Sequence, residues 1–537
     1  MDNEILVISK NMKLNLFSKD TSIARTILVA GETVLVWLVI TAQVFVFNKF
    51  SGNEVDILPS ARQFFDPNWL PGDWYLNLDI GYRQLFSYLV GILVDQLGFL
   101  YGAYAGRVIA HLLLALALVV FFRSIRLRFS LGLIVVFIFL ADQSLIAGEW
   151  IVGGVDTKTF AYAFALFSFS SLIQKRYLAG FAFAGAALSF HVLVGIYALF
   201  CSGVAMLLTW NSWRIEWRTL IRQTWPFFIT GIFGLLSVLQ QLLPQGDIDT
   251  DKAWQIYVKL RVPHHVLPSA WNSDLLALQL ILVAGFFLAI YLLKKTAASK
   301  FTAAYALGSI CLFVIGLVIY ATGETNLLRF YWFRYPDVMI PFLTLVLVAL
   351  VISDLTYIDV NDSPRFYKRW PSVHLLISKG LPLFLAIVVI LLALQSITII
   401  RASYRRGINR RPSKIQTSLK WISENTPGHA VFLVDPLMSE FYVFAERARF
   451  VSFNHSPQSA ADILEWYERI ELSNGSQPPS IPVARGELQE NFYHLDEETI
   501  RQIAENFGLS YYLGLANTQL PFELVYRDDN ISLFAID

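Results

Sequence analysis

Residues 26–67 read TILVAGETVLVWLVITAQVFVFNKFSGNEVDILPSARQFFDP. The part from 26 to 48 is an almost continuous apolar run, and a bilayer core requires about 20 such residues at about 1.5 Å each. No small-residue cleavage site interrupts the run, so we expect it to remain as an uncleaved anchor. Glu54 and Asp56 follow directly. The stretch therefore predicts a membrane span with two carboxylates at its edge.

The composition extends this prediction to the whole chain. Of its 537 residues, 55% are apolar and only 15% are charged, and the mean hydropathy is +0.52. These values lie far from the balance of soluble domains. We predict a mostly α-helical, polytopic transmembrane bundle of about eleven spans. The predicted spans are 26–48, 103–122, 130–147, 159–173, 177–190, 192–210, 224–243, 274–293, 301–321, 338–356 and 380–400.

Two observations argue against nucleic-acid binding and against a role for cysteine in disulfides or metal sites. The net charge of +1 gives no support for nucleic-acid binding. Cys201 and Cys311 both fall inside apolar runs, so neither a disulfide framework nor a thiol metal site is predicted. No cofactor is predicted, and a divalent metal is not indicated.

Basic loops give the predicted orientation. Lys and Arg concentrate in the N-terminal tail, 1–25, and in the loops at 123–128, 174–176, 214–222, 294–300 and 365–369. Because such loops stay in the cytoplasm, we expect a multi-pass protein of a bacterial inner or plasma membrane with a cytoplasmic N-terminus. Arg176 and Arg214 should share a side, which favours two crossings with a turn near His191 over one long helix. The basic linker 401–414 disagrees, because the same count places it outside.

Residues 415–537 have the composition of a small α/β domain. A helix pattern, a Pro-Gly turn and the strand pattern AVFLVDP come first, and the helix pattern EETIRQIAENFG and three short strand patterns follow. We expect this domain to be extracytoplasmic, after a transmembrane domain at 26–400. A miscounted span would move it to the cytoplasm.

The predicted outer loops collect the unusual polar residues. Carboxylates lie early in the chain and cations late. A carboxylate can accept the proton of an attacking hydroxyl, and cations can neutralise a departing phosphate, as transfer of a sugar from a lipid-linked phosphate requires. The candidate substrate-binding residues are Lys158, His191, Lys259, Arg261, His264, His265, Arg329 and Arg334.

The layout resembles a known superfamily. An acidic pair in the first outer loop, the segment ARQFFDP, a second acidic loop before an aromatic helix, about eleven spans and a C-terminal α/β domain resemble the GT-C superfamily of polytopic glycosyltransferases, which use polyprenyl-phosphate sugars. The segments VDTKTFAY and RVPHHVLP are similar to a less characterised branch of that fold. The resemblance covers nearly the whole chain and is one of layout more than of strict motif.

The resemblance implies a catalytic or acceptor-orienting role for the first-loop carboxylates, here Glu54 and Asp56. Many members have adjacent Asp-Glu where this chain has Glu-Val-Asp, so both residues are candidates. We expect Asp156 to face the same cavity. The implied partners are a lipid-linked sugar donor, membrane lipids and an unidentified acceptor. A transporter or lipid flippase, and a GT-C-like scaffold without activity, are the alternatives.

Overall fold

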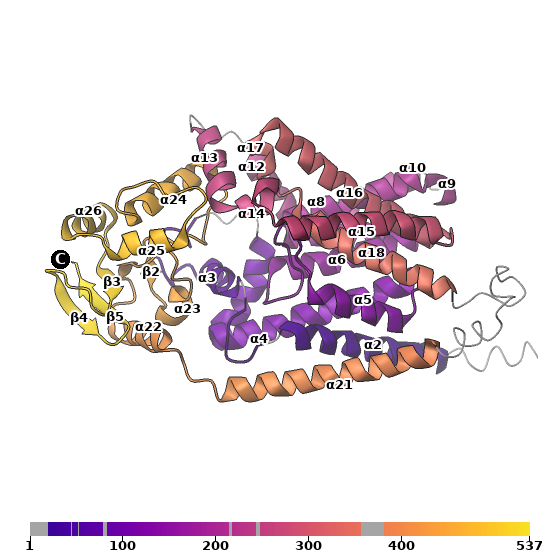
Figure 1. Cartoon of the computed structure of the whole chain (residues 1–537), viewed down its shortest axis with the longest axis horizontal. Helices are drawn as coiled ribbons and strands as arrows, with labels where there is room; N and C mark the ends of the chain where they lie inside the picture. Colours follow the sequence, from indigo (N-terminus) through magenta and orange to yellow (C-terminus); the bar gives the residue numbers. More distant parts are fainter. Residues whose placement is uncertain are drawn as a thin grey trace, which may run out of the picture.

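The structure is a computed structural model that describes residues 20–44, 46–51, 53–78, 83–213, 217–242, 248–355 and 381–536. A bundle of helices occupies one part of the molecule, and a small α/β domain caps one end of it (Figure 1). Most of the predicted N-terminal tail and the basic loop 365–369 lie outside the described residues.

The bundle contains helices of very different lengths. Their bounds are α2 Asp20–Val44, α3 Glu54–Phe65, α4 Gln84–Ser124, α5 Phe129–Ala141, α6 Thr157–Ile173, α7 Tyr177–Phe190, α8 Val192–Leu208, α9 Trp210–Trp213, α10 Trp217–Arg222, α11 Trp225–Thr230, α12 Ile232–Leu242, α13 Thr250–Ile256, α14 Pro263–Val266, α15 Ser273–Leu292, α16 Ala297–Thr322, α17 Thr325–Leu328, α18 Arg334–Leu355 and α21 Leu381–Ile408. A π-helical turn, Tyr257–Arg261, follows α13, and a 3₁₀ turn, Pro268–Ala270, follows α14.

Within the described residues, six helices are long and apolar enough to cross a membrane: α2, α4, α15, α16, α18 and α21. Shorter apolar helices accompany them, including α5, α7, α8 and most of α12. The described residues thus form a mostly helical, apolar bundle with six long candidate spans and several shorter apolar helices, where about eleven spans were predicted. α4 is much longer than the predicted span 103–122, because a second helix joins it at Gly98, whose φ of 74° lies in the region that favours glycine.

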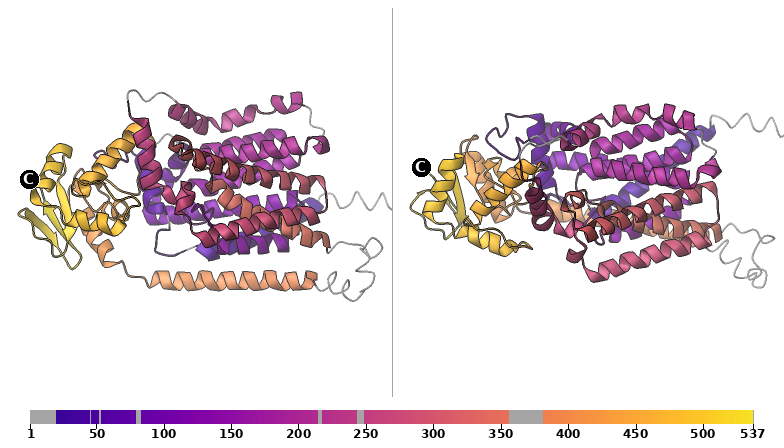
Figure 2. Two further views of the ribbon diagram at one scale, coloured as in Figure 1. Left: turned by 45° about the horizontal axis from the view of Figure 1, so that its top comes forward. Right: turned by 90° about the horizontal axis from the view of Figure 1, so that it is seen from above.

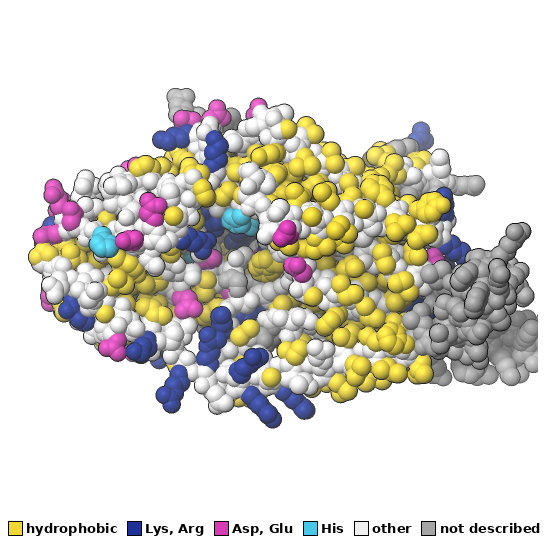
Figure 3. All heavy atoms as spheres, viewed as in Figure 1, with side chains coloured by type: hydrophobic (Ala, Val, Ile, Leu, Met, Phe, Trp, Pro, Cys, Tyr) yellow, Lys and Arg dark blue, Asp and Glu magenta, His cyan; other side chains and the backbone are white. Residues whose placement is uncertain are grey.

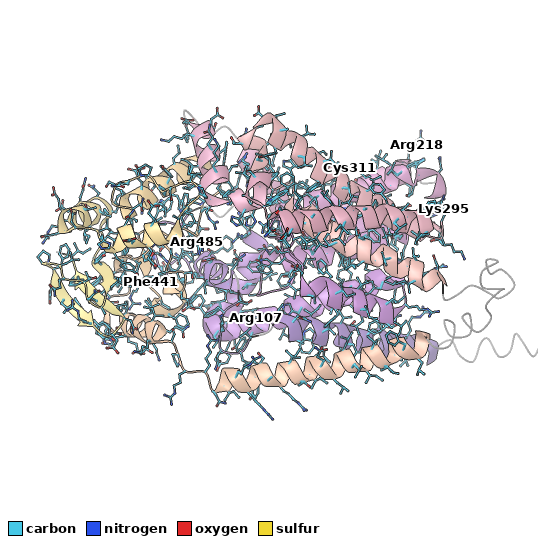
Figure 4. All side chains as sticks on the ribbon, in the orientation of Figure 1. Arg107, Arg218, Lys295, Cys311, Phe441 and Arg485 are labelled. Atoms are coloured by element: carbon cyan, nitrogen blue, oxygen red, sulfur yellow. The ribbon has the colours of Figure 1, made fainter. Side chains whose placement is uncertain are left out.

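The ends of the bundle differ in charge. Arg218 and Lys295, from two of the basic loops, lie at the end away from the C-terminal domain (Figure 4). At the opposite end, Gly407 of α21 packs against Phe47, and Asn48 Nδ2 donates to the Gly407 carbonyl at 2.7 Å. α2 and α21 therefore run in the same direction and finish at the end that carries α3 and the C-terminal domain. The basic residues 401–408 extend α21, so the predicted linker is partly helical.

The C-terminal domain is built on one mixed five-stranded sheet with the order β2-β1-β3-β5-β4. β1 pairs in parallel with β2 and β3, and β5 pairs antiparallel with β3 and β4. The strands are β1 Val431–Leu433, β2 Ala448–Arg449, β3 Tyr511–Leu515, β4 Glu523–Arg527 and β5 Ile531–Ala535. The helices are α22 Lys414–Asn425, α23 Phe441–Ala445, α24 Ala460–Ser473, α25 Arg485–Tyr493 and α26 Glu497–Phe507.

Polar contacts join this domain to α3 and to the loop that follows it. The Asp73 carboxylate accepts hydrogen bonds from the Tyr442 hydroxyl at 2.8 Å and from the Arg449 backbone N–H at 3.0 Å. Arg62 of α3 pairs with Glu446 at 2.5 Å. Asp73 is 1% exposed, so it anchors the domain from a buried position. Figure 2 shows the domain against the α3 and α13 end in two further views.

Candidate functional site

A cavity of about 380 Å³ lies between the bundle and the C-terminal domain. Its walls are formed by α3, α8, α12, α13, the π-helical turn, the start of α18 and the loop after β2. Its acidic, basic and histidine lining residues are Asp56, Arg83, His191, Arg261, His265, Arg329, Arg334 and His455. Four arginines thus face one carboxylate among the described lining residues.

Asp56 lies in the first turn of α3 and reaches the cavity. Its side chain is 21% exposed, and desolvation raises the pKa of this carboxyl to about 6, although Arg261, Arg449 and Arg83 oppose the shift. In an extended segment, the side chains of Glu54 and Asp56 would point to the same side. They begin a helix instead, because Asn53 precedes two acidic residues that are favourable near a helix N-terminus.

His455 comes from the C-terminal domain and packs on Asp56. Its Nε2–H donates to the Asp56 backbone carbonyl at 3.0 Å, and Nε2 lies 3.6 Å from Asp56 Oδ1. Because a carbonyl can only accept, Nε2 carries the proton. Burial lowers the pKa of His455 to about 3, and Arg449 and Arg261 act in the same direction, so the ring is neutral. His455 therefore holds Asp56 without neutralising its charge.

The turn between α17 and α18 presents two arginines. The Arg329 guanidinium stacks on Trp254, 3.8 Å from the ring centroid, and Arg334 begins α18. Between them Tyr331 has a φ of 55°, an unusual value for a bulky residue, and its hydroxyl contacts the Tyr257 hydroxyl at 2.7 Å. Arginines fixed in this way present planar donors that suit phosphate oxygens.

The loop 142–156 holds Arg334 in place. Glu149 pairs with Arg334 at 2.5 Å and with Lys158 at 3.6 Å. The Asp337 carboxylate fixes the loop by accepting hydrogen bonds from the backbone N–H groups of residues 145, 146, 147 and 149, at 2.8 to 3.2 Å. The Asp337 carboxylate therefore shapes the loop. Asp337 lies about one helical turn after Arg334, the residue that the loop contacts through Glu149.

Glu54 lies outside the cavity. Its side chain is fully buried and paired with Arg107 of α4, whose Nε donates to Oε1 at 2.7 Å, and the Val155 backbone N–H donates to the same oxygen at 2.7 Å. Arg107 also donates to the carbonyls of Val46 and Lys49. Arg107 lies beside α3 in Figure 4. Glu54 thus joins the first loop, α4 and the loop 142–156.

The remaining predicted residues divide between the cavity and its surroundings. His191 lines the cavity, and its Nδ1 accepts from the Val194 N–H at the start of α8, where the predicted turn is found. His265 also lines it, and its Nδ1–H donates to the Ala147 carbonyl at 2.6 Å. Burial and the charge of Arg334 hold the pKa of His265 well below its ordinary value.

Asp156 and Lys158 are buried behind the cavity wall. Asp156 caps α6 and accepts from Asn53 Nδ2 at 3.4 Å, and Asn53 is the residue that reaches the cavity. Lys158 lies between Asp156 and Glu149, with Nζ 3.7 Å from the Trp150 ring centroid. Lys259 and His264 are exposed and are absent from the cavity lining. The structure therefore brings together Asp56, His191, Arg261, His265, Arg329 and Arg334.

Sequence reasoning missed the contribution of the C-terminal domain. Asn454, His455 and Gln458 line the cavity from the loop before α24, and Asn454 accepts from Arg261 through its carbonyl at 2.8 Å. The polar segment SFNHSPQS, residues 452–459, was the available signal. Arg83 also lines the cavity and was not among the predicted site residues. Asp337, which fixes the loop 142–156, was not among them either.

The arrangement combines one carboxylate of raised pKa with several fixed guanidinium groups and neutral imidazoles. Such a site can accept a proton at Asp56 and stabilise an anion on the arginine side. Among the described residues, no group of three or more His, Cys, Asp or Glu is arranged to hold a metal ion.

Comparisons with known proteins found one family model and several solved structures that are similar to this chain. A family described as a domain of unknown function, DUF6798, matches residues 413–473. No curated protein matches the chain. The fold is similar, over 95% of this chain and 98% of that chain, to ArnT from Cupriavidus metallidurans bound to undecaprenyl phosphate, with 13% identity and a TM-score of 0.49.

A second similar structure is the archaeal oligosaccharyltransferase AglB from Archaeoglobus fulgidus, in complex with an inhibitory peptide and a dolichol-phosphate. The similarity covers 92% of this chain and 70% of that one, with 12% identity and a TM-score of 0.48. Structural similarity to these glycosyltransferases therefore extends over nearly the full chain.

Proposed function

We propose that this protein transfers a sugar from a polyprenyl-phosphate donor to a hydroxyl acceptor in the cavity between the bundle and the C-terminal domain. The observation that carries the proposal is the division of charge in that cavity, with Asp56 on α3 and the arginines Arg261, Arg329 and Arg334 on later elements. A transfer site needs a base and an anion-binding side at once.

In the proposed reaction Asp56 acts as the base, and the arginines stabilise the departing phosphate. The ionised Asp56 carboxylate accepts the proton of the acceptor hydroxyl as its oxygen bonds to the anomeric carbon of the sugar. The bond from that carbon to the donor phosphate breaks, and polyprenyl phosphate departs with the bonding electrons. Arg329 and Arg334 then offset the added negative charge. His455 is a positioning residue, because it holds the backbone of Asp56 without protonating the base.

Apolar lining residues support a lipid-linked donor over a soluble one. Val192 and Ile196 of α8, together with Val238 of α12, form one wall of the cavity. Leu236 and Leu239, which flank Val238, are 46% and 58% exposed on the bundle. An apolar chain can lie along these helices while its phosphate reaches the arginines, as the amphipathic donor requires.

Donor binding tests the proposal directly. We expect Arg329→Ala to weaken binding of a polyprenyl phosphate by about 10- to 150-fold, because a hydrogen bond to a charged group contributes about 1.5–3 kcal/mol. Lys259→Ala is the matched control, since it removes a nearby cation that does not line the cavity. Equal binding by the wild-type protein and Arg329→Ala, in a folded variant, would refute the role of Arg329.

A further inference from the structure

The basic segment at the end of α21 has no role in the proposed reaction. It includes Arg401, Arg405, Arg406, Arg410 and Arg411, all of which are exposed. Figure 3 shows basic side chains gathered along the edge where α21 approaches the C-terminal domain. The apolar side chains of the bundle flank begin directly beside them. The segment therefore lies where a membrane surface meets the protein.

A groove accompanies this segment. It has a volume of about 410 Å³ and lies between the last turns of α2 and of α21. Val44, Val46, Phe47 and Ile399 supply apolar lining, and Arg406 and Arg410 supply the positive charge. Gly407 and Phe47 pack closely at this groove, since a Cβ added at Gly407 would lie 2.1 Å from Phe47 Cβ. Ile399 and Arg406 lie on one face of α21 at a spacing of seven residues, and Arg410 follows just after the helix ends at Ile408.

The length of α21 places this groove at headgroup depth. From Leu381 to Ile400 the helix is uncharged, and about 20 residues at about 1.5 Å each span the hydrocarbon core of about 30 Å. Arg406 lies six positions further, about 9 Å beyond the core edge. Tyr404, which is 47% exposed, lies at the same level, where aromatic residues are enriched.

We propose that this groove binds one anionic phospholipid of the surrounding leaflet, with its phosphate on Arg406 and Arg410 and an acyl chain along Val44, Val46 and Ile399. The charge of the two arginines complements an anionic headgroup, and the apolar lining complements the chain. The proposal is independent of the sugar-transfer reaction. It also gives the segment 401–411 a function at whichever membrane face the C-terminal domain occupies.

Native mass spectrometry of the full chain in detergent tests the proposal. We expect phosphatidylglycerol to bind more tightly than phosphatidylcholine with the same acyl chains. The double variant Arg406→Gln/Arg410→Gln should lose about 30-fold in phosphatidylglycerol affinity, because each basic residue near an anionic surface contributes a factor of about five. Glycerol phosphate, which lacks acyl chains, should not compete.

The variant Arg405→Gln/Arg411→Gln is the matched control, because it removes the same charge from the same segment without altering the groove lining. Retained phosphatidylglycerol affinity in this control supports a defined site. Equal losses in both double variants would show general attraction to charge and overturn the proposal. Equal binding of the two phospholipids, or competition by glycerol phosphate, would also overturn it.

Discussion

Glu54 and Asp56 are two positions apart in the chain but lie in opposite environments. Glu54 is buried in a pair with Arg107, whereas Asp56 faces the cavity opposite the arginines. Either residue fits the role of base on sequence grounds alone. Their surroundings favour Asp56 as the base and give Glu54 the task of holding the first loop in place.

Replacement of Asp56 tests its chemical role. We expect Asp56→Asn to lower the transfer rate by a factor of about 100 to 10,000, the usual effect of removing a general base. The wild-type rate should rise with pH through about 6, because only the ionised carboxylate accepts a proton. A variant that keeps full activity, or a wild-type rate that is flat from pH 5 to 7, contradicts this role.

The raised pKa of Asp56 also has a consequence for stability. The folded protein binds its proton more tightly than the unfolded chain, whose aspartates titrate near about 3.9. The contribution of this carboxyl to the free energy of unfolding is therefore fully present below pH 4 and falls as the pH rises through about 6. Asp56→Asn should lack this decline, so above pH 6 its unfolding temperature should equal or exceed that of the wild type.

Replacement of Glu54 should affect folding first. Breaking a buried ion pair by removal of one charge costs about 3–5 kcal/mol, and Glu54→Gln leaves the buried Arg107 without its counter-ion. We expect a clearly lower unfolding temperature and lower yield than for Asp56→Asn. Thermal unfolding of both variants in the same detergent gives the comparison. Equal stability of the two would show that Glu54 does not hold the loop.

At the scale of elements, the loop 142–156 is positioned by the helix that carries Arg334. Asp337 accepts hydrogen bonds from four backbone N–H groups of the loop. Asp337→Asn replaces one acceptor oxygen by a donor and therefore removes some of these four hydrogen bonds. We expect hydrogen exchange at residues 145–149 to accelerate at least 10-fold, which corresponds to about 1.4 kcal/mol. Unchanged exchange there would contradict the role of Asp337 as the anchor.

Several elements could be predicted because their local patterns agree with their environment. The apolar runs around 26–48, 274–293 and 301–321 became α2, α15 and α16, and the strand patterns after residue 430 became β1, β3, β4 and β5. α3 was missed because Pro59 lies inside it and an alternating Glu-Val-Asp suggests extended backbone. Strand β2 has only two residues, which are too few to give a strand pattern in the sequence.

The candidate site could be predicted only in part, because some of its residues meet only when distant parts of the chain pack together. Arg261, His265, Arg329 and Arg334 lie in loops that the topology brings to one end of the bundle, so their convergence follows from the order of spans. His455 lies almost 400 residues after Asp56, and its contact with that residue depends on docking of a separate domain. Lys259 and Arg261 are two positions apart, and only the π-helical turn decides which of them faces the cavity.

At the scale of the whole molecule, the start of α2 and the C-terminal domain lie at opposite ends of the bundle (Figure 1). Arg218 and Lys295 lie at the end with the start of α2. We predict that this end is cytoplasmic and that residues 415–537 are extracytoplasmic, because short basic loops stay inside. A reporter active only in the periplasm, fused after Asp537, should be active. Activity of a cytoplasm-specific reporter at that position would reverse the predicted orientation.

We propose that one cavity holds a lipid-linked phosphate between Asp56 and the arginines. The most direct measurement is an experimental structure of the full chain with a bound polyprenyl phosphate. We predict phosphate oxygens at about 2.7–2.9 Å from guanidinium nitrogens of Arg329 or Arg334, with the lipid chain along α8 and α12. A phosphate bound elsewhere on the protein, with this cavity unoccupied, would contradict the account.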